Sequence, residues 1–418
     1  MQSGYNVDAM VSDTNPIPTQ FEIQKIPSED PNITRKEPNY FGAGPALIST
    51  SVLQQAAQDL INFQGIGLGA GEISHRSAAG ANIIESTRQH LVELLDIPDT
   101  HEVFFMQGGG TTGFSSIATN LTASFAKKTG RKGTPAYVVT GSWSKKAAEE
   151  ATRLGFNPDI VLDSKKVDGK FGTIPDTDRW SIPKDLSNTS YLYFCDNETV
   201  NGVEFPEFPF DKFPGVEIVA DMSSNFLSRK VDVSKYGCIF AGAQKNVGLA
   251  GITVYIIRKS LLDHPAEDEL TKLNIPLSPI AFDFPTVVKN KSAYNTIPTF
   301  TVHIVDLVLQ HLIRKGGLDV QQKINEQKAQ LLYEALDEFP SVYKLPVEKS
   351  VRSKMNVVFT LADGSDAEFL KAAEKRELTG LKGHRSVGGM RASLYNAVSL
   401  ESVKLLCDFV RAYGAERA

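Results

Sequence analysis

Cysteine is scarce in this sequence, and long hydrophobic runs are absent. Only three cysteines occur in 418 residues, at Cys195, Cys238 and Cys407. An odd number of widely separated cysteines forms neither a disulfide framework nor a metal cluster, and it favours a reducing compartment. No stretch approaches the roughly 18 uncharged apolar residues of a membrane span. The N-terminus also lacks the apolar run of a signal peptide. We therefore expect a cytoplasmic protein without a bound metal or a membrane partner.

Neither sign of charge is in large excess. The chain has 44 basic and 49 acidic residues and a net charge of −5. A protein that binds the phosphate backbone of nucleic acid usually carries a basic excess, so we expect no nucleic-acid partner. Hydrophobic residues make up 41% of the chain and charged residues 22%, as in ordinary globular proteins. The length predicts two or three domains.

The chain divides into three parts by composition and pattern. Residues 1–38 are polar and contain five prolines, which predicts a flexible N-terminal extension. Residues 39–295 are expected to form a large domain and residues 296–418 a smaller C-terminal one. The second boundary rests on a change of pattern near residue 300, where long helical stretches begin.

Short runs of β-formers alternate with amphipathic helices in the large domain. Strand-like runs occur at 103–106, 137–140, 191–194, 218–220, 238–241 and 252–257, and helical spacing occurs at 51–63, 82–95, 111–126 and 144–153. Apolar runs separated by helices predict an α/β fold with a mostly parallel sheet between helices. Beyond residue 300, helices near 303–315, 320–339, 366–376 and 400 onward, with strands near 356–360 and 391–394, predict a smaller α+β domain.

Lys245 and Asp221 are the first candidate catalytic pair. Lys245 lies among small residues just after an apolar run, where a desolvated amine could form a Schiff base with an aldehyde. Asp221 ends another run, at the sheet edge where α/β folds bind ligands. Pyridoxal phosphate needs both groups, a lysine for its aldehyde and a carboxylate for its ring nitrogen. Taken singly, a loop lysine and a turn aspartate remain open readings.

Two further segments follow strands and could contact a cofactor. The loop Gln107–Gly113 contains three consecutive glycines before a helix, which suits phosphate binding, although a generic glycine turn remains possible. It matches neither the P-loop nor the GxGxxG pattern. Trp143, one of only two tryptophans, could stack on a planar ring or pack in the core.

The triplet His-Arg-Ser occurs twice, in glycine-rich surroundings. Its copies begin at His75-Arg76 and at His384-Arg385. Arginine binds carboxylate or phosphate through two parallel hydrogen bonds, and a neighbouring histidine adds a donor. Two such pairs suit a substrate that is anionic at both ends, while two surface arginines are the alternative.

Together these motifs resemble the phosphoserine aminotransferases, particularly the eukaryotic or fungal kind. The resemblance spans roughly residues 39–415 and rests on ordered motifs that include 41–46, 72–77, 107–110, 141–144, 196–204, 221–225, 241–246, 295–299 and 383–389. It implies a class V aminotransferase of fold type I, with a seven-stranded, mostly parallel sheet in the large domain and pyridoxal 5′-phosphate as cofactor.

The resemblance also implies roles for matching residues. Lys245 would hold the cofactor and move a substrate proton, and Asp221 would pair with the ring nitrogen. The cofactor-binding set would be Gly110, Thr111, Trp143, Thr199, Asp221, Gln244 and Lys245, completed by Asn295 and Thr296 from the second subunit of a homodimer. Arg385 would hold the substrate α-carboxylate, and His75, Arg76 and His384 would face the distal anion.

Two positions depart from relatives. Thr111 stands where some bacterial members have an arginine, and Ala43 lacks a hydroxyl that some members carry.

The reaction implied is 3-phosphohydroxypyruvate plus L-glutamate to O-phospho-L-serine plus 2-oxoglutarate, by ping-pong kinetics, in serine biosynthesis. An alanine–glyoxylate aminotransferase is the main alternative, but its small substrates would not need a second anion clamp. A cysteine desulfurase would need a mobile reactive cysteine. A binding protein that carries the cofactor without turnover is a further alternative.

Overall fold

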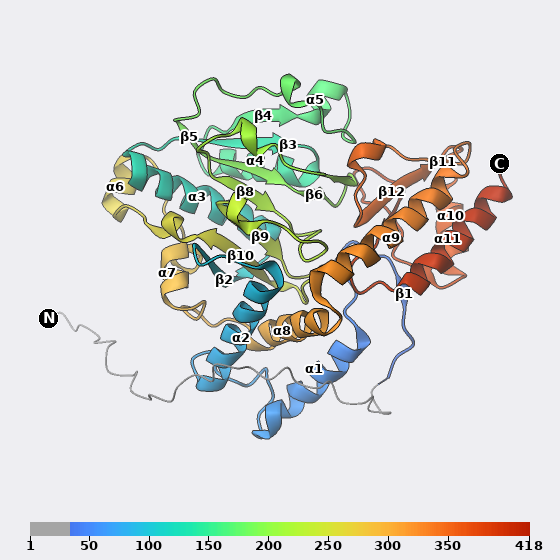
Figure 1. Ribbon diagram of the computed structural model, residues 1–418, viewed down its shortest axis with the longest axis horizontal. Helices are drawn as coiled ribbons and strands as arrows, with labels where there is room; N and C mark the ends of the chain where they lie inside the picture. The colour runs from blue at the N-terminus through green and yellow to red at the C-terminus, as the bar shows by residue number, and fades with distance from the viewer. Residues whose placement is uncertain (1–33) are drawn as a thin grey trace.

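The computed structural model describes residues 34–418 (Figure 1). Most of the predicted N-terminal extension, residues 1–33, therefore lies outside the described residues. Arg35, near the start of the described chain, donates from Nη2 to the Ile48 carbonyl at 2.8 Å. Among the described residues, no helix has the length and apolar character that a membrane crossing requires.

A seven-stranded sheet forms the centre of the molecule (Figure 1). Four parallel pairings join β9, β8, β5, β3 and β4, whereas β10 runs antiparallel to both β9 and β2. The predicted α/β class with a mostly parallel sheet is therefore confirmed, and β10 is the reversed strand. In spatial order the strands are β2 (His101–Gly108), β10 (Gly251–Arg258), β9 (Cys238–Gly242), β8 (Ile218–Asp221), β5 (Thr189–Cys195), β3 (Thr134–Val139) and β4 (Asp159–Asp163).

Helices cover both faces of this sheet, which explains why its strands are apolar on both sides. Alternate residues point to opposite faces, so Phe105 joins the core beneath α2 (Ala78–Leu95) and α8 (Thr299–Arg314). Its neighbour Phe104 joins the core beneath α3 (Gly110–Thr129) and α4 (Ser142–Arg153).

The reversal of β10 follows from a short connection. Only residues 243–250 join β9 to β10, and a parallel return would need a crossover of a dozen or more residues. The chain therefore turns back at the carboxyl end of β9. This turn places Lys245 at the sheet edge where the parallel strands also end.

A second core lies in the C-terminal part of the chain. Its antiparallel sheet has the order β11 (Tyr343–Lys344), β12 (Asn356–Leu361), β14 (Met390–Ser393), packed with α9 (Gly317–Asp337), α10 (Asp366–Glu374) and α11 (Leu400–Ala415). Strand β1 (Asn39–Tyr40) pairs with β13 (Leu378–Thr379), and Phe41 is buried in this second core. Helix α8 instead packs in the first core. The division at residue 295 stays a prediction.

The remaining α-helices and strands are short or peripheral. They are α1 (Thr50–Asn62), α5 (Ser164–Asp168), α6 (Glu267–Lys272), α7 (Phe284–Lys289), β6 (Asn197–Glu198) and β7 (Val203–Glu204). The last two form a hairpin directly after β5.

Candidate active site

A cavity of about 640 Å³ lies where β2, β5, β8 and β9 end. Parallel strands direct their carboxyl ends to one edge, which is where open α/β sheets bind ligands. The structure brings eight of the residues singled out from the sequence into its lining: Gly110, Thr111, Trp143, Thr199, Asp221, Gln244, Lys245 and His384.

Lys245 projects into this cavity from the β9–β10 connection. Its Nζ donates to Thr199 Oγ1 at 2.7 Å. Burial lowers the pKa of the Lys245 amine to about 8, although the nearby Asp221 carboxylate acts in the opposite direction. An amine with this pKa is partly neutral near pH 7, and a neutral amine is the form that attacks an aldehyde.

Asp221 is the last residue of β8 and is buried. Its Oδ1 accepts the Ser223 backbone N–H at 2.9 Å, and its Oδ2 accepts the Tyr193 hydroxyl at 3.2 Å. Burial raises the pKa of the Asp221 carboxyl, and a cationic partner in the cavity would lower it. These two hydrogen bonds fix the carboxylate at the cavity wall, where it can pair with a protonated ring nitrogen.

The N-terminus of α3 supplies an anion site in the same cavity. Gly109, which precedes the helix, has no side chain to cap it, and Gly110, Thr111 and Thr112 line the cavity. The first N–H groups of a helix have no partner within the helix and carry the positive end of its dipole. They are suited to a phosphate group.

Four buried polar side-chain atoms of lining residues have no hydrogen-bond partner in the described structure. They are Trp143 Nε1, Asn197 Oδ1, Gln244 Oε1 and Arg391 Nε. Orphaned polar atoms beside a lysine, a carboxylate and a helix N-terminus indicate that a polar ligand completes the cavity. The donor set fits pyridoxal 5′-phosphate, with an amine for the aldehyde, a carboxylate for the ring nitrogen and amides for the phosphate.

An arginine that sequence reasoning missed also lines the cavity. Arg391 on β14 donates from Nη1 to the Thr199 carbonyl at 3.2 Å, while its buried Nε has no partner in the described structure. His384 lines the same cavity, and its Nδ1 lies 2.7 Å from Ser386 Oγ. Arg385 is exposed and is not part of the lining. A lone arginine in the apolar run 390–394 was the signal available in the sequence.

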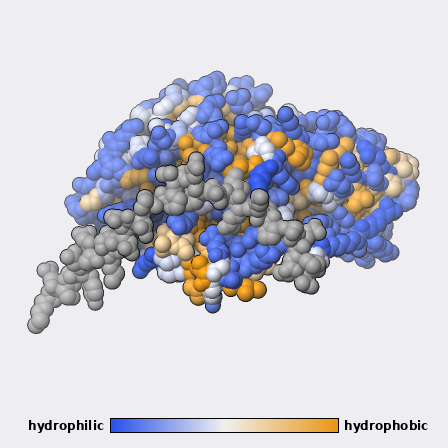
Figure 2. Space-filling model, turned by 60° about the horizontal axis from the view of Figure 1, so that its bottom comes forward, coloured by the Kyte–Doolittle hydropathy of each residue, from blue (hydrophilic) through white to orange (hydrophobic). Residues whose placement is uncertain are grey.

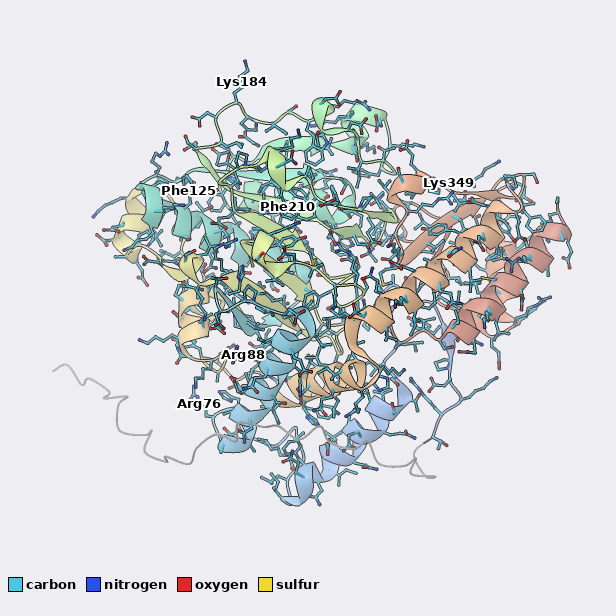
Figure 3. The ribbon with its side chains drawn as sticks, viewed as in Figure 1. Arg76, Arg88, Phe125, Lys184, Phe210 and Lys349 are labelled. Carbon is cyan, nitrogen blue, oxygen red and sulfur yellow. The ribbon has the colours of Figure 1, made fainter. Side chains whose placement is uncertain are left out.

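The other expected site residues lie together outside the cavity lining. Arg76 Nη2 donates to the Tyr294 carbonyl at 3.2 Å. Gln107, at the end of β2, accepts from Asn295 Nδ2 at 3.0 Å and donates to the Thr296 carbonyl at 2.6 Å. His75, the neighbour of Arg76, is buried. Arg76 lies near the start of α2 at the lower edge of the molecule in Figure 3, away from the centre of the sheet.

Comparison with known proteins defines the class of this site. The family model Aminotransferase class-V matches residues 39–406. Enzymes of this class depend on pyridoxal 5′-phosphate, in agreement with the donor set of the cavity.

Curated and solved relatives narrow the class. The chain is 57% identical over 394 residues to phosphoserine aminotransferase of Saccharomyces cerevisiae, covering 93% of this chain and 100% of the relative. The structure of phosphoserine aminotransferase from Bacillus circulans subsp. alkalophilus has a TM-score of 0.82 and 36% identity, covering 91% and 99% of the two chains. A pyridoxal-phosphate-bound phosphoserine aminotransferase from Trichomonas vaginalis has a TM-score of 0.80 and 35% identity, covering 90% and 100%. The chain belongs to the phosphoserine aminotransferase family.

Proposed function

We propose that the protein interconverts 3-phosphohydroxypyruvate plus L-glutamate and O-phospho-L-serine plus 2-oxoglutarate, as a step of serine biosynthesis. Membership of the phosphoserine aminotransferase family supports this reaction. The observation that carries it is a single cavity containing Lys245, Asp221, the α3 N-terminus and the cations Arg391 and His384. An amine, a carboxylate and two kinds of anion site are what the transfer of an amino group between acidic substrates requires.

Lys245 would move the proton at the substrate Cα. Pyridoxal 5′-phosphate supplies an electron sink that makes this proton acidic. The lowered pKa of Lys245 lets its amine accept a proton near neutral pH, and Thr199 Oγ1 orients it through the 2.7 Å hydrogen bond. Asp221 would keep the sink effective by pairing with the ring nitrogen.

Arg391 is the residue that we propose holds the substrate α-carboxylate. Its guanidinium lines the cavity and retains an unpaired, buried Nε, which leaves a donor for a carboxylate. This assignment differs from the expectation for Arg385, whose side chain is exposed. His384, on the same side of the cavity, is suited to the distal anion.

We further propose a homodimer in which each active site receives residues from both subunits. Besides Arg385, four expected site residues lie outside the cavity lining of their own chain: His75, Arg76, Asn295 and Thr296. His75 Nε2 is buried without a hydrogen-bond partner in the described structure. A second subunit would give these donors a ligand at its own cavity.

An apolar surface supports the same assembly. Large apolar side chains are exposed at the end of α1 and in the loop that follows: Leu60, Ile61, Ile66 and Leu68, of which Ile61 is 77% exposed. Figure 2 shows an orange patch at the lower front of the molecule, the side on which α1 lies in Figure 1. A contiguous apolar patch of this kind marks a protein interface. The cytoplasm remains our expected compartment, from the sparse cysteine content.

The proposed reaction is tested by substrate preference. Purified protein loaded with pyridoxal phosphate should convert phosphoserine and 2-oxoglutarate far faster than alanine and glyoxylate. Arg76→Ala should reduce kcat/KM for phosphoserine by roughly 100-fold, because it removes a paired anion contact. Use of alanine should change little. A protein that prefers alanine and glyoxylate would overturn the proposal, and one that binds the cofactor without turnover would be a binding protein.

A further inference from the structure

The N-terminus of α4 reaches the same cavity as that of α3. The first backbone amides of α4, however, already have hydrogen-bond partners within the protein. The Ser142 N–H donates to Asn201 Oδ1 at 2.8 Å. The Trp143 N–H donates to Glu198 Oε2 and the Ser144 N–H to Glu198 Oε1, both at 2.8 Å. The first three amides of α4 are therefore satisfied by residues 198–201, and α3 is left as the helix whose N-terminus can bind a phosphate.

Glu198 takes the place of a helix cap. Residue Gly141, which precedes α4, has no side chain, and the Glu198 carboxylate approaches from strand β6 instead. Glu198 has 0% exposure, and Ser144 Oγ lies 2.5 Å from its Oε1. Burial raises the pKa of the Glu198 carboxyl, while its hydrogen bonds from Ser144 and Trp143 stabilise the charged form.

Gly141 packs directly against the Glu198 carboxylate. A Cβ added at Gly141 would lie 2.5 Å from the Glu198 carboxyl carbon. The carboxylate can reach the α4 amides only because this position lacks a side chain.

The residue after Glu198 contacts the catalytic lysine. Thr199 Oγ1 accepts a hydrogen bond from Lys245 Nζ, whereas Glu198 Oε2 accepts one from the Trp143 backbone N–H. Two consecutive residues therefore fix two walls of the cavity, one carrying the amine and one carrying the indole. A displacement of Glu198 would move the indole relative to the amine.

We propose that Glu198 is a positioning residue that sets the Trp143 indole at its place in the cofactor cavity. The part of this inference that concerns the cofactor rests on the proposed function. The part that concerns the Trp143 side chain holds for the protein without cofactor. Glu198 itself is not a catalytic residue, because both oxygens of its carboxylate accept hydrogen bonds from the backbone amides of α4.

The test uses Glu198→Gln in a Trp180→Phe background, where Trp143 is the remaining tryptophan. An amide side chain has one acceptor oxygen, so one of the two α4 amides would face an NH₂ group. In the apoprotein, the fluorescence of Trp143 should shift, and its indole ring should become more accessible to the quencher acrylamide. Affinity for pyridoxal phosphate should fall about tenfold, as expected for one lost charge-assisted hydrogen bond.

A matched control is Asp163→Asn. Asp163 also caps a helix with a carboxylate, accepting the Lys166 N–H of α5 at 3.2 Å, but it lies outside the cavity lining. This variant should leave Trp143 fluorescence and cofactor affinity unchanged. If it altered both as much as Glu198→Gln does, general destabilisation would explain the effect and the proposal would be wrong.

A double-mutant comparison separates positioning from folding. In a Trp143→Phe background, Glu198→Gln should change cofactor affinity by less than about twofold, because the positioned indole is absent. An undiminished tenfold effect would overturn the proposal. Should Glu198→Gln fail to fold, Gly141→Ala displaces the same carboxylate with its charge retained, and the same fluorescence shift is expected. The fluorescence measurement uses the apoprotein and does not depend on the proposed reaction. A failure of the positioning proposal can therefore be distinguished from a failure of the proposed reaction.

Discussion

Lys245 illustrates how burial alone can prepare a side chain for chemistry. The pKa of its amine is lowered to about 8 because burial disfavours the ammonium form. Apoprotein should therefore take up pyridoxal phosphate faster as pH rises, with the rate levelling off above about pH 8, where the amine is neutral. Stopped-flow absorbance across pH 6–10 would measure this profile. A profile that is flat through pH 8 would contradict the lowered pKa.

A variant provides the control for that profile. Lys245→Ala should remain folded but show neither the visible band of covalently held cofactor nor turnover. Retained activity in this variant would remove Lys245 from the mechanism.

Arg391 and Arg385 make opposite predictions about the substrate carboxylate. Arg391→Lys should lower kcat/KM for both glutamate and phosphoserine by roughly 100-fold, because lysine cannot make the two parallel hydrogen bonds. Arg385→Ala should cost less than about tenfold, since its side chain is exposed. Steady-state kinetics with both amino donors would decide. A larger loss in Arg385→Ala would restore the role expected from the sequence.

The difference between these two arginines shows where sequence reasoning reached its limit. The repeated His-Arg-Ser triplet drew attention to Arg385, but proximity in sequence to His384 does not fix a side chain's direction. Strand β14 does fix it, because Met390 and Ala392 are buried on one side while Arg391 points to the other. Lys245, Asp221 and Trp143 were easier to place, since each follows an apolar run that ends at one sheet edge.

At the scale of elements, α3 and α4 have similar N-termini and different tasks. Thr111 lies in the first turn of α3 and lines the cavity. Thr111→Asp should stabilise the apoprotein by about 0.5 kcal/mol, because a negative charge suits a helix N-terminus. The same charge would repel a phosphate group, so affinity for pyridoxal phosphate should fall at least tenfold. Thermal unfolding and cofactor titration would measure the two effects, and a parallel change in both would argue against a phosphate at α3.

Regular elements were largely predictable, and their pairing was less so. The helix expected at 144–153 is α4 at Ser142–Arg153, and the strand expected at 252–257 is β10 at Gly251–Arg258. Strand β4 was missed because its apolar residues form a very short run between Asp159 and Asp163. The direction of β10 was not predicted, because an apolar run carries no information about which way its chain crosses the sheet.

At the scale of the whole molecule, active sites shared between two subunits predict that two inactive variants can regain activity in a mixed dimer. Lys245→Ala and an Asn295→Ala/Thr296→Ala double variant should each be inactive as pure dimers. Mixed dimers would contain one site with both defects and one site with neither. Co-refolding equal amounts should therefore restore about a quarter of the wild-type activity. No recovery, in samples where differently tagged subunits are shown to exchange, would mean that each site belongs to one chain.

The pairing of β1 with β13 has a consequence for the order in which the protein is made. Residues 39–41 leave the ribosome early, yet their strand partner and the core around Phe41 come from residues near the end of the chain. The large sheet is complete in sequence at Arg258 and can form during synthesis. Phe41 therefore lacks part of its packing core until α11 has been translated. The first described strand of the chain is therefore among the last to be buried, and a nascent chain would present it to chaperones throughout translation.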